Sequence, residues 1–82
     1  MKRTVNIDKE YQTGDTQKAI NKFFKTHSDI EYWKETLEWM LREGVEHFVD
    51  DTLADGSKTD WSYSIWLYPE ETYTYIAVIE RA

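Results

Sequence analysis

The strongest hydrophobic pattern lies near the C-terminus, where two runs of β-branched and aromatic residues flank a short polar break. The runs cover residues 59–68 and 72–80, and Pro69, Glu70 and Glu71 lie between them. This arrangement predicts a β-hairpin with Glu70 and Glu71 at the tip of its turn.

Alternation of side chains along the two strands sorts this hairpin into two faces. Counted from the tip, Leu67 pairs with Thr74, and the face that they share is rich in Ile, Leu, Val and Trp. We expect it to be the core face. The other face holds aromatic residues among small and polar neighbours. Its aromatic pairs are Trp66 with Tyr75 and Tyr68 with Tyr73.

Upstream of the hairpin, the pattern predicts one short strand and a first helix. Alternating apolar and polar residues predict an edge strand over residues 2–8. Asp15 or Thr16 can cap a helix that runs to about Thr26. The apolar residues of this helix fall on one face. They are Ala19, Ile20, Phe23 and Phe24.

A second helix is predicted to begin at Ser28, because Ser28 and Glu31 have the spacing of a capping box. Gly44 is the type of residue that ends a helix. Tyr32 and Trp39 fall outside the apolar arc of this helix, on the side that should face water. The arc itself consists of Ile30, Trp33, Leu37, Met40 and Leu41.

Residues 45–53 alternate between apolar and polar positions and predict a further strand. Gly56, in the turn over residues 54–58, suits the left-handed position of a three-residue hairpin loop. That loop pairs Leu53 with Ser57 and, further along, His47 with Tyr63. The core face of this strand would then consist of Val45, His47, Val49 and Leu53.

Together these elements predict an α+β fold in a single domain over residues 1–82. A four-stranded, mainly antiparallel sheet carries two helices packed on one face, in the order β-α-α-β-β-β. The pattern leaves open which edge of the sheet the first strand joins. The aromatic residues of the hairpin's second face would lie on the side away from the helices.

Composition narrows the class of partner. The formal net charge is −6, from 16 acidic and 10 basic residues, which argues against direct binding of nucleic acid or of an anionic membrane surface. The lack of cysteine favours a reducing, cytoplasmic setting. The sequence has no apolar run of transmembrane length, and no apolar segment follows Lys2 and Arg3 as it would in a signal peptide.

Candidates for catalysis or metal binding are weak. His47 has carboxylates near it in the sequence and could act in acid–base chemistry, but a strand histidine half-buried beside Tyr63 is the simpler interpretation. The spacing of the acidic residues around the predicted loop does not match a calcium-binding loop. These residues are Asp50, Asp51, Asp55 and Asp60. We therefore expect no metal, no cofactor and no enzymatic activity.

The surplus of aromatic residues is the best functional lead, because aromatic side chains dominate the energetics of protein interfaces. We expect a non-enzymatic protein-binding module whose partner has a basic surface. The expected partner-binding aromatic residues are Trp66, Tyr68, Tyr73, Tyr75, Tyr32 and Trp39. Acidic residues at the rim would steer the partner, namely Glu70, Glu71, Asp55 and Asp60.

In composition the chain is similar to the small, acidic, cysteine-free proteins of phages and mobile elements, such as anti-CRISPR proteins. That likeness implies an inhibitor that blocks a nucleic-acid-binding surface of a larger protein complex. Carboxylates would replace phosphates there, and aromatic rings would replace bases.

Three other interpretations stay open. The chain could form a homodimer through its aromatic sheet face or through exposed edge strands. It could be a small ligand-binding or hydrolytic domain that uses His47 and the nearby carboxylates, although a sheet-and-helix domain of this size has little room for a pocket. The aromatic pairs could also simply stabilise an exposed sheet face.

Overall fold

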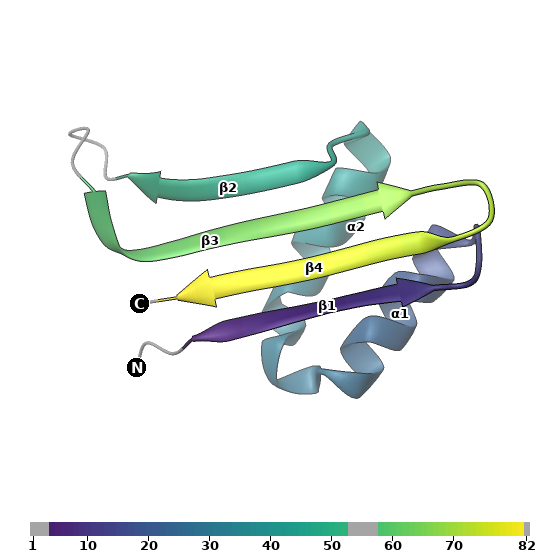
Figure 1. The fold of residues 1–82 in the computed structure, drawn as a ribbon, viewed down its shortest axis with the longest axis horizontal. Coiled ribbons are helices and arrows are strands. Elements are labelled where there is room, and N and C mark those ends of the chain that lie inside the picture. The colour runs from purple at the N-terminus through teal and green to yellow at the C-terminus, as the bar shows by residue number, and fades with distance from the viewer. Residues whose placement is uncertain (1–3, 53–57, 82) are drawn as a thin grey trace.

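The computed structural model describes the backbone of residues 4–52 and 58–81, and the side chains of residues 4–49 and 62–81. Within it, four strands form one antiparallel sheet, and the helices cover one of its faces (Figure 1). The predicted α+β fold and its element order are confirmed. The elements are β1 (Val5–Tyr11), α1 (Thr16–Thr26), the 3-10 helix η1 (Ser28–Trp33), α2 (Lys34–Glu43), β2 (His47–Thr52), β3 (Lys58–Pro69) and β4 (Thr74–Arg81).

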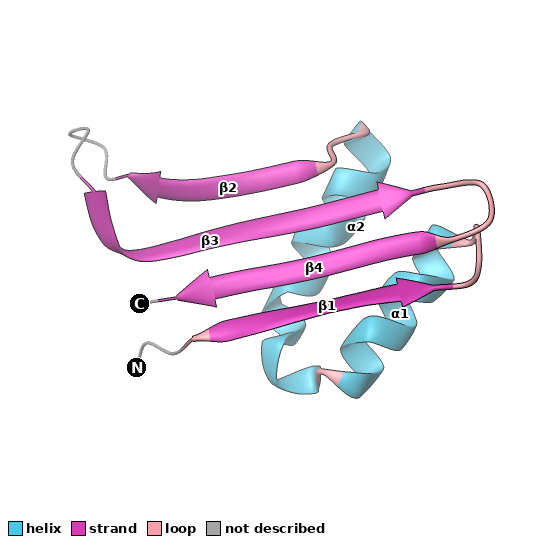
Figure 2. Cartoon of the chain, in the orientation of Figure 1, coloured by secondary structure: helices cyan, strands magenta, loops and turns pink. Residues whose placement is uncertain are grey.

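The strand order across the sheet is β1-β4-β3-β2, so β1 and β2 are the edges. The sequence left the position of the first strand open, and the structure pairs it antiparallel with β4, from Val5 opposite Glu80 to Tyr11 opposite Thr74. The strand also runs further than the predicted residues 2–8, because β4 offers backbone partners as far as Thr74. Figure 2 shows α1 and α2 together behind this sheet.

The hairpin of β3 and β4 forms as predicted, but its register differs by two residues. Leu67 lies opposite Ile76 instead of Thr74. The turn is longer than expected and is closed by the Glu70 N–H, which donates to the Tyr73 carbonyl at 2.9 Å. A register shift by an even number of residues leaves every side chain on the same face of the hairpin. It does change the aromatic pairs: Trp66 lies opposite Ala77, and Tyr68 lies opposite Tyr75.

The register of β2 was predicted wrongly, and here the faces are exchanged. Thr52 lies opposite Lys58, as the expected loop implies, but the pairing then shifts so that His47 lies opposite Trp66 instead of Tyr63. The difference of three residues is odd, so His47 leaves the core face and Phe48 takes its place. Val49 is likewise outward and 54% exposed. The expected loop pairing of Leu53 with Ser57, with Gly56 in the turn, lies outside the described residues.

The exchange has an energetic reason, because Phe48 has more apolar surface to bury than the imidazole of His47. On the core side the Phe48 ring lies 5.4 Å from that of Tyr63 and 5.7 Å from that of Trp39, measured between ring centroids. The irregularity in the pairing of β2 with β3 falls between Asp50 and Thr52.

Both helices place their predicted apolar residues toward the sheet. Of the two predicted caps, Asp15 is the one that caps α1, since its carboxylate accepts from the Lys18 backbone N–H at 3.1 Å. Gly44 ends α2 with a φ of 72°. The predicted start of the second helix at a Ser28 capping box is wrong. Residues 28–33 form the 3-10 helix η1, no side chain caps it, and the backbone at Ile30 is not helical.

The helices pack against a continuous apolar core from both helices and the three strands β1, β3 and β4. Its fully buried residues include Ile20, Phe23 and Phe24 of α1, Leu37 and Met40 of α2, and Ile65, Leu67, Ile76 and Val78 of the hairpin. Burial on this side accounts for the sorting of the hairpin faces, because the four fully buried hairpin residues of this core all belong to the predicted core face.

A buried carboxylate at the end of β4 fastens η1 to the sheet. Glu80 is only 1% exposed. The Tyr32 hydroxyl donates to its Oε1 at 2.6 Å, and the Trp33 indole Nε1–H donates to its Oε2 at 3.1 Å. These contacts outweigh the local preference of residues 28–31 for a capped α-helix.

Replacing the carboxylate should therefore loosen η1. Glu80→Leu removes both acceptors, and we expect it to lower the free energy of unfolding by about 1–3 kcal/mol, the usual contribution of hydrogen bonds to a charged group. Glu80→Gln keeps one acceptor and should cost less. Urea unfolding followed by circular dichroism measures both. A Glu80→Leu variant as stable as the wild type would contradict this role.

A second close contact lies at the opposite end of β4, where the loop before α1 meets the β3–β4 turn. The buried Thr74 hydroxyl donates to the Thr13 carbonyl at 3.0 Å and lies 3.3 Å from the Thr16 hydroxyl. Beside it, Gly14 approaches the turn so closely that a Cβ there would lie 2.1 Å from the Glu71 carbonyl oxygen.

Gly14→Ala should force the two loops apart. We expect a loss of about 1–3 kcal/mol in the free energy of unfolding, as for other overpacked sites. Gly44→Ala is the matched comparison, because its cost comes from a left-handed backbone with no atom within 4 Å of the new Cβ. Chemical unfolding of both variants distinguishes the cost of steric overlap from the cost of backbone strain. A Gly14→Ala variant as stable as the wild type would show that Gly14 does not lie against the Glu71 carbonyl.

Candidate functional site

The sheet face turned away from the helices, called here the outer face, carries a row of rings that crosses three strands. The aromatic row consists of His47 on β2, Trp66 and Tyr68 on β3, and Tyr75 on β4. His47 stacks on Trp66 with ring centroids 3.6 Å apart and planes within 8°. Trp66 and Tyr68, and then Tyr68 and Tyr75, follow at 5.8 Å each.

Contact within the row leaves each of Trp66, Tyr68 and Tyr75 partly buried, although no helix of the described chain covers them. His47 covers one face of the Trp66 indole, and Tyr68 and Tyr75 stack on each other, so the rings shield part of one another's surface from solvent. An ordered set of neighbouring rings of this kind loses little side-chain entropy when a partner binds, because the rotamers are already restricted.

The fourth strand of the sheet contributes polar groups to the same face. Asp8 of β1 lies opposite Ala77, and Glu10 lies opposite Tyr75. The Tyr75 hydroxyl donates to Asp8 Oδ2 at 3.3 Å. The aromatic row therefore ends against carboxylates at the β1 edge.

The environment of Tyr75 changes its ionisation. Partial burial raises the pKa of the Tyr75 phenol, and Asp8 raises it further through its negative charge and its hydrogen bond. The neighbouring Tyr68 acts in the same direction. Because the folded state holds this proton more tightly than the unfolded chain, its contribution to stability is complete below about pH 10 and is lost as the pH rises through the raised pKa.

Asp8→Asn should lower the pKa of Tyr75 toward its ordinary value, because it removes the charge of the hydrogen-bond acceptor. The shift is measured by following the ring-carbon NMR signals of Tyr75 through an alkaline titration. Tyr11 is an internal control, since burial alone raises its pKa. An unchanged Tyr75 pKa in the variant would mean that Asp8 is not in contact with the phenol.

A hollow of about 360 Å³ opens on the outer face beside the row. Ala77 lies at its base, between Trp66 of β3 on one side and Asp8 of β1 on the other. Tyr75 and Ile79 lie two positions away along β4. The hollow exists because a methyl group occupies a position whose neighbours are long side chains. Its lining is Asn6, Asp8, Trp66, Tyr68, Tyr75, Ala77 and Ile79.

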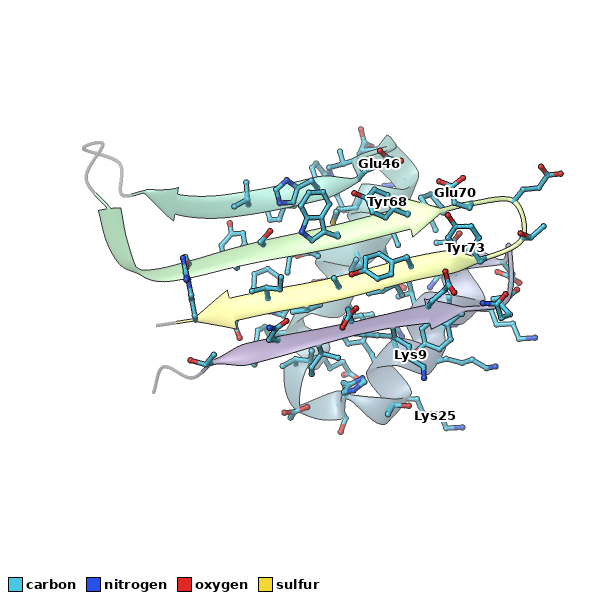
Figure 3. All side chains as sticks on the ribbon, viewed as in Figure 1. Lys9, Lys25, Glu46, Tyr68, Glu70 and Tyr73 are labelled. Atoms are coloured by element: carbon cyan, nitrogen blue, oxygen red, sulfur yellow. The ribbon has the colours of Figure 1, made fainter. Side chains whose placement is uncertain are left out.

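The predicted partner-binding residues do not all gather in one place. Trp66, Tyr68 and Tyr75 lie together on the outer face, whereas Tyr73 lies in the turn that precedes β4. Figure 3 shows Tyr73 and Glu70 at the same end of the sheet as Tyr68, and Glu46 close by at the start of β2. Lys9 and Lys25 lie on the other side of the view, on β1 and α1. Glu70 and Glu71 are both exposed in the turn.

The aromatic residues of the second helical segment belong to the helix side of the sheet. Tyr32 is 56% exposed, and its hydroxyl is bound to Glu80. Trp39 is 38% exposed and packs edge-on against Phe48. The position of Trp39 has a structural explanation, because β2 presents Phe48 to it. Of the other predicted rim residues, Asp55 and the side chain of Asp60 lie outside the described part of the chain.

Two residues of this face were not predicted from the sequence, His47 and Asp8. His47 was assigned to the core face because the odd register shift of β2 was not foreseen. Asp8 carries no local signal, because its position depends on which edge β1 joins. Alternation along β4 places Ala77 on this face, but the expected register put Ser64 opposite it instead of Trp66. The same alternation places Glu80 on the core face, but the sequence contains no indication that its carboxylate would accept hydrogen bonds from Tyr32 and Trp33.

Features expected of an enzyme are sparse on this face. The His47 Nε2 lies 2.7 Å from the Ser64 hydroxyl, a distance suited to a base and a nucleophile. Among the described residues no carboxylate is hydrogen-bonded to His47, and no group of three or more His, Asp or Glu side chains could hold a metal ion. His47 is exposed, so the interpretation as a half-buried histidine beside Tyr63 is wrong.

No family model, curated protein or solved structure matches this chain. Within residues 4–52 and 58–81, no helix is long and apolar enough to cross a membrane.

Proposed function

We propose that this chain is a non-enzymatic protein-binding module that docks its outer face on a positively charged surface of a larger protein. The observation that carries the proposal is the aromatic row, which the helices leave uncovered. Ring residues at the centre of an interface supply much of its binding free energy, and Trp and Tyr are the most enriched among such residues.

The charge of the chain supports a basic partner. The formal net charge is −6, and Asp8 and Glu10 share the outer face with the rings. Carboxylates beside partly buried rings favour cationic groups and repel phosphates, so direct binding of nucleic acid is disfavoured. A surface that normally binds nucleic acid has the complementary charge.

In its specific form, the proposal is that the module inhibits a nucleic-acid-binding protein by occupying its nucleic-acid site. Carboxylates would take the place of phosphates, and the rings would take the place of stacked bases. Small inhibitors of phages and mobile elements, such as anti-CRISPR proteins, act on partners of this type. The lack of cysteine is consistent with action in the cytoplasm.

Pairing of two copies through the outer face is less favoured by the charge distribution. Face-to-face contact with the β1 edges of the two copies together would bring the carboxylates of Asp8 and Glu10 in each copy toward like charges of the other. Sedimentation at micromolar concentration measures the oligomeric state. A stable dimer that the double variant Trp66→Ala, Tyr75→Ala dissociates would replace the present proposal.

The docking face is tested by capture from a nuclease-treated lysate of the native host, followed by purification of the captured protein. We expect a basic nucleic-acid-binding protein that the double variant Trp66→Ala, Tyr75→Ala binds at least about tenfold more weakly, because two central rings are lost. Trp39→Ala is the matched control, since it removes a ring on the helix side and should leave the affinity unchanged.

Competition then tests the inhibitor form of the proposal. Added nucleic acid and raised salt concentration should both lower the affinity measured by calorimetry. Binding that responds to neither would exclude mimicry of nucleic acid. Equal affinity of the wild type and the double variant would exclude docking through the outer face.

A further inference from the structure

We infer that the hollow over Ala77 receives a single arginine side chain of the partner. This inference rests on the proposed function, and it adds the chemical group that the outer face recognises. The hollow joins aromatic surface on β3 and β4 to a carboxylate on β1, and guanidinium groups bind to that combination.

The walls and base of the hollow come from residues that lie opposite one another on three neighbouring strands. Trp66, Ala77 and Asp8 form one line across β3, β4 and β1. Ala77 is 2% exposed, so its methyl group lies below the level of the side chains around it. A long side chain that enters here would have an indole on one side and a carboxylate on the other.

Two further aromatic side chains, Tyr68 and Tyr75, line the hollow. Tyr75 lies beside Ala77 on β4, and its ring stacks with that of Tyr68 at an angle of 22°. The Tyr75 hydroxyl holds Asp8 by a hydrogen bond, which orients the carboxylate at the edge of the hollow. Asn6 adds a carboxamide on the β1 side. The site therefore offers aromatic faces for stacking and oxygen acceptors for N–H groups.

These features favour arginine over lysine. A guanidinium is planar and less strongly hydrated than an ammonium, so it can stack on a ring while its N–H groups donate to a carboxylate. Cation–π attraction is strongest over tryptophan, and Trp66 forms one wall. The same hollow is a poor site for a nucleotide, because Asp8 and the nearby Glu10 repel its phosphate.

The isolated chain allows a direct test by NMR titration, with no partner protein. The probes are N-acetyl-arginine amide, its lysine counterpart and the neutral isostere N-acetyl-citrulline amide. We expect the arginine probe to shift the amide signals of Asp8 and Ala77 and the indole signal of Trp66, with a dissociation constant on the order of millimolar. Lysine should bind about twofold to fivefold more weakly, and citrulline should produce no saturable shift.

Two variants locate the binding site. Asp8→Asn should weaken arginine binding by about twofold to fivefold, the usual effect of one exposed ionic contact. Glu35→Gln changes the net charge equally, at an exposed position on α2, and should have no effect. Ala77→Val fills the base of the hollow and should abolish the shifts. If that variant does not fold, Trp66→Leu removes the wall and should weaken binding.

The outcomes separate this inference from the proposed function. Equal shifts with citrulline, equal binding by Asp8→Asn, or shifts centred on Glu70 and Glu71 would overturn the arginine site and leave docking by the outer face intact. A nucleotide such as AMP that produces the same shifts would also overturn it. Arginine binding at the hollow, together with unchanged protein capture by the double variant, would instead overturn the proposed function.

Discussion

The structure depends on one imbalance: a sheet has two faces, and the helices in the described part of the chain cover only one of them. Burial of Ile65, Leu67, Ile76 and Val78 beneath α1 and α2 drives the fold, because that side collects nearly all the aliphatic surface. The outer face must remain in water. It remains compatible with water through rings that cover one another and through polar residues at the β1 edge, instead of through a uniformly charged surface.

Two polar contacts hold the helical layer in place at the ends of β4. Thr74 binds the loop before α1 at one end, and Glu80 binds η1 at the other. Both side chains are buried on the core face, where an unpaired polar group would be costly, so each contact is also specific. The sheet that carries the aromatic row is therefore hydrogen-bonded to its helical layer at both ends of β4.

The outer face combines features that are each ordinary. Cross-strand rings stabilise many sheets, and acidic residues are frequent on surfaces. The placement of both kinds of side chain around Ala77 is more informative about the group that this face could bind. Trp66 and Asp8 lie on either side of Ala77, so aromatic and acidic groups face one hollow. The proposed partner, a protein that presents cationic side chains, is chosen because net charge, the aromatic row and the hollow are all compatible with it.

Local pattern was enough to determine the element order, a cap for α1 at Asp15 or Thr16, and the two faces of the β3–β4 hairpin. Those features depend on periodicity and short-range hydrogen bonds, and an even register error does not alter them. The tertiary structure alone decided the edge that β1 joins, the inward turn of Phe48 in place of His47, and the contacts of Glu80 with Tyr32 and Trp33. Each of these features depends on contacts with residues that are distant in the sequence. Local pattern does not determine which of those residues will fill the core. The hollow over Ala77 belongs to the second group, because its walls come from three strands that only the folded sheet brings together.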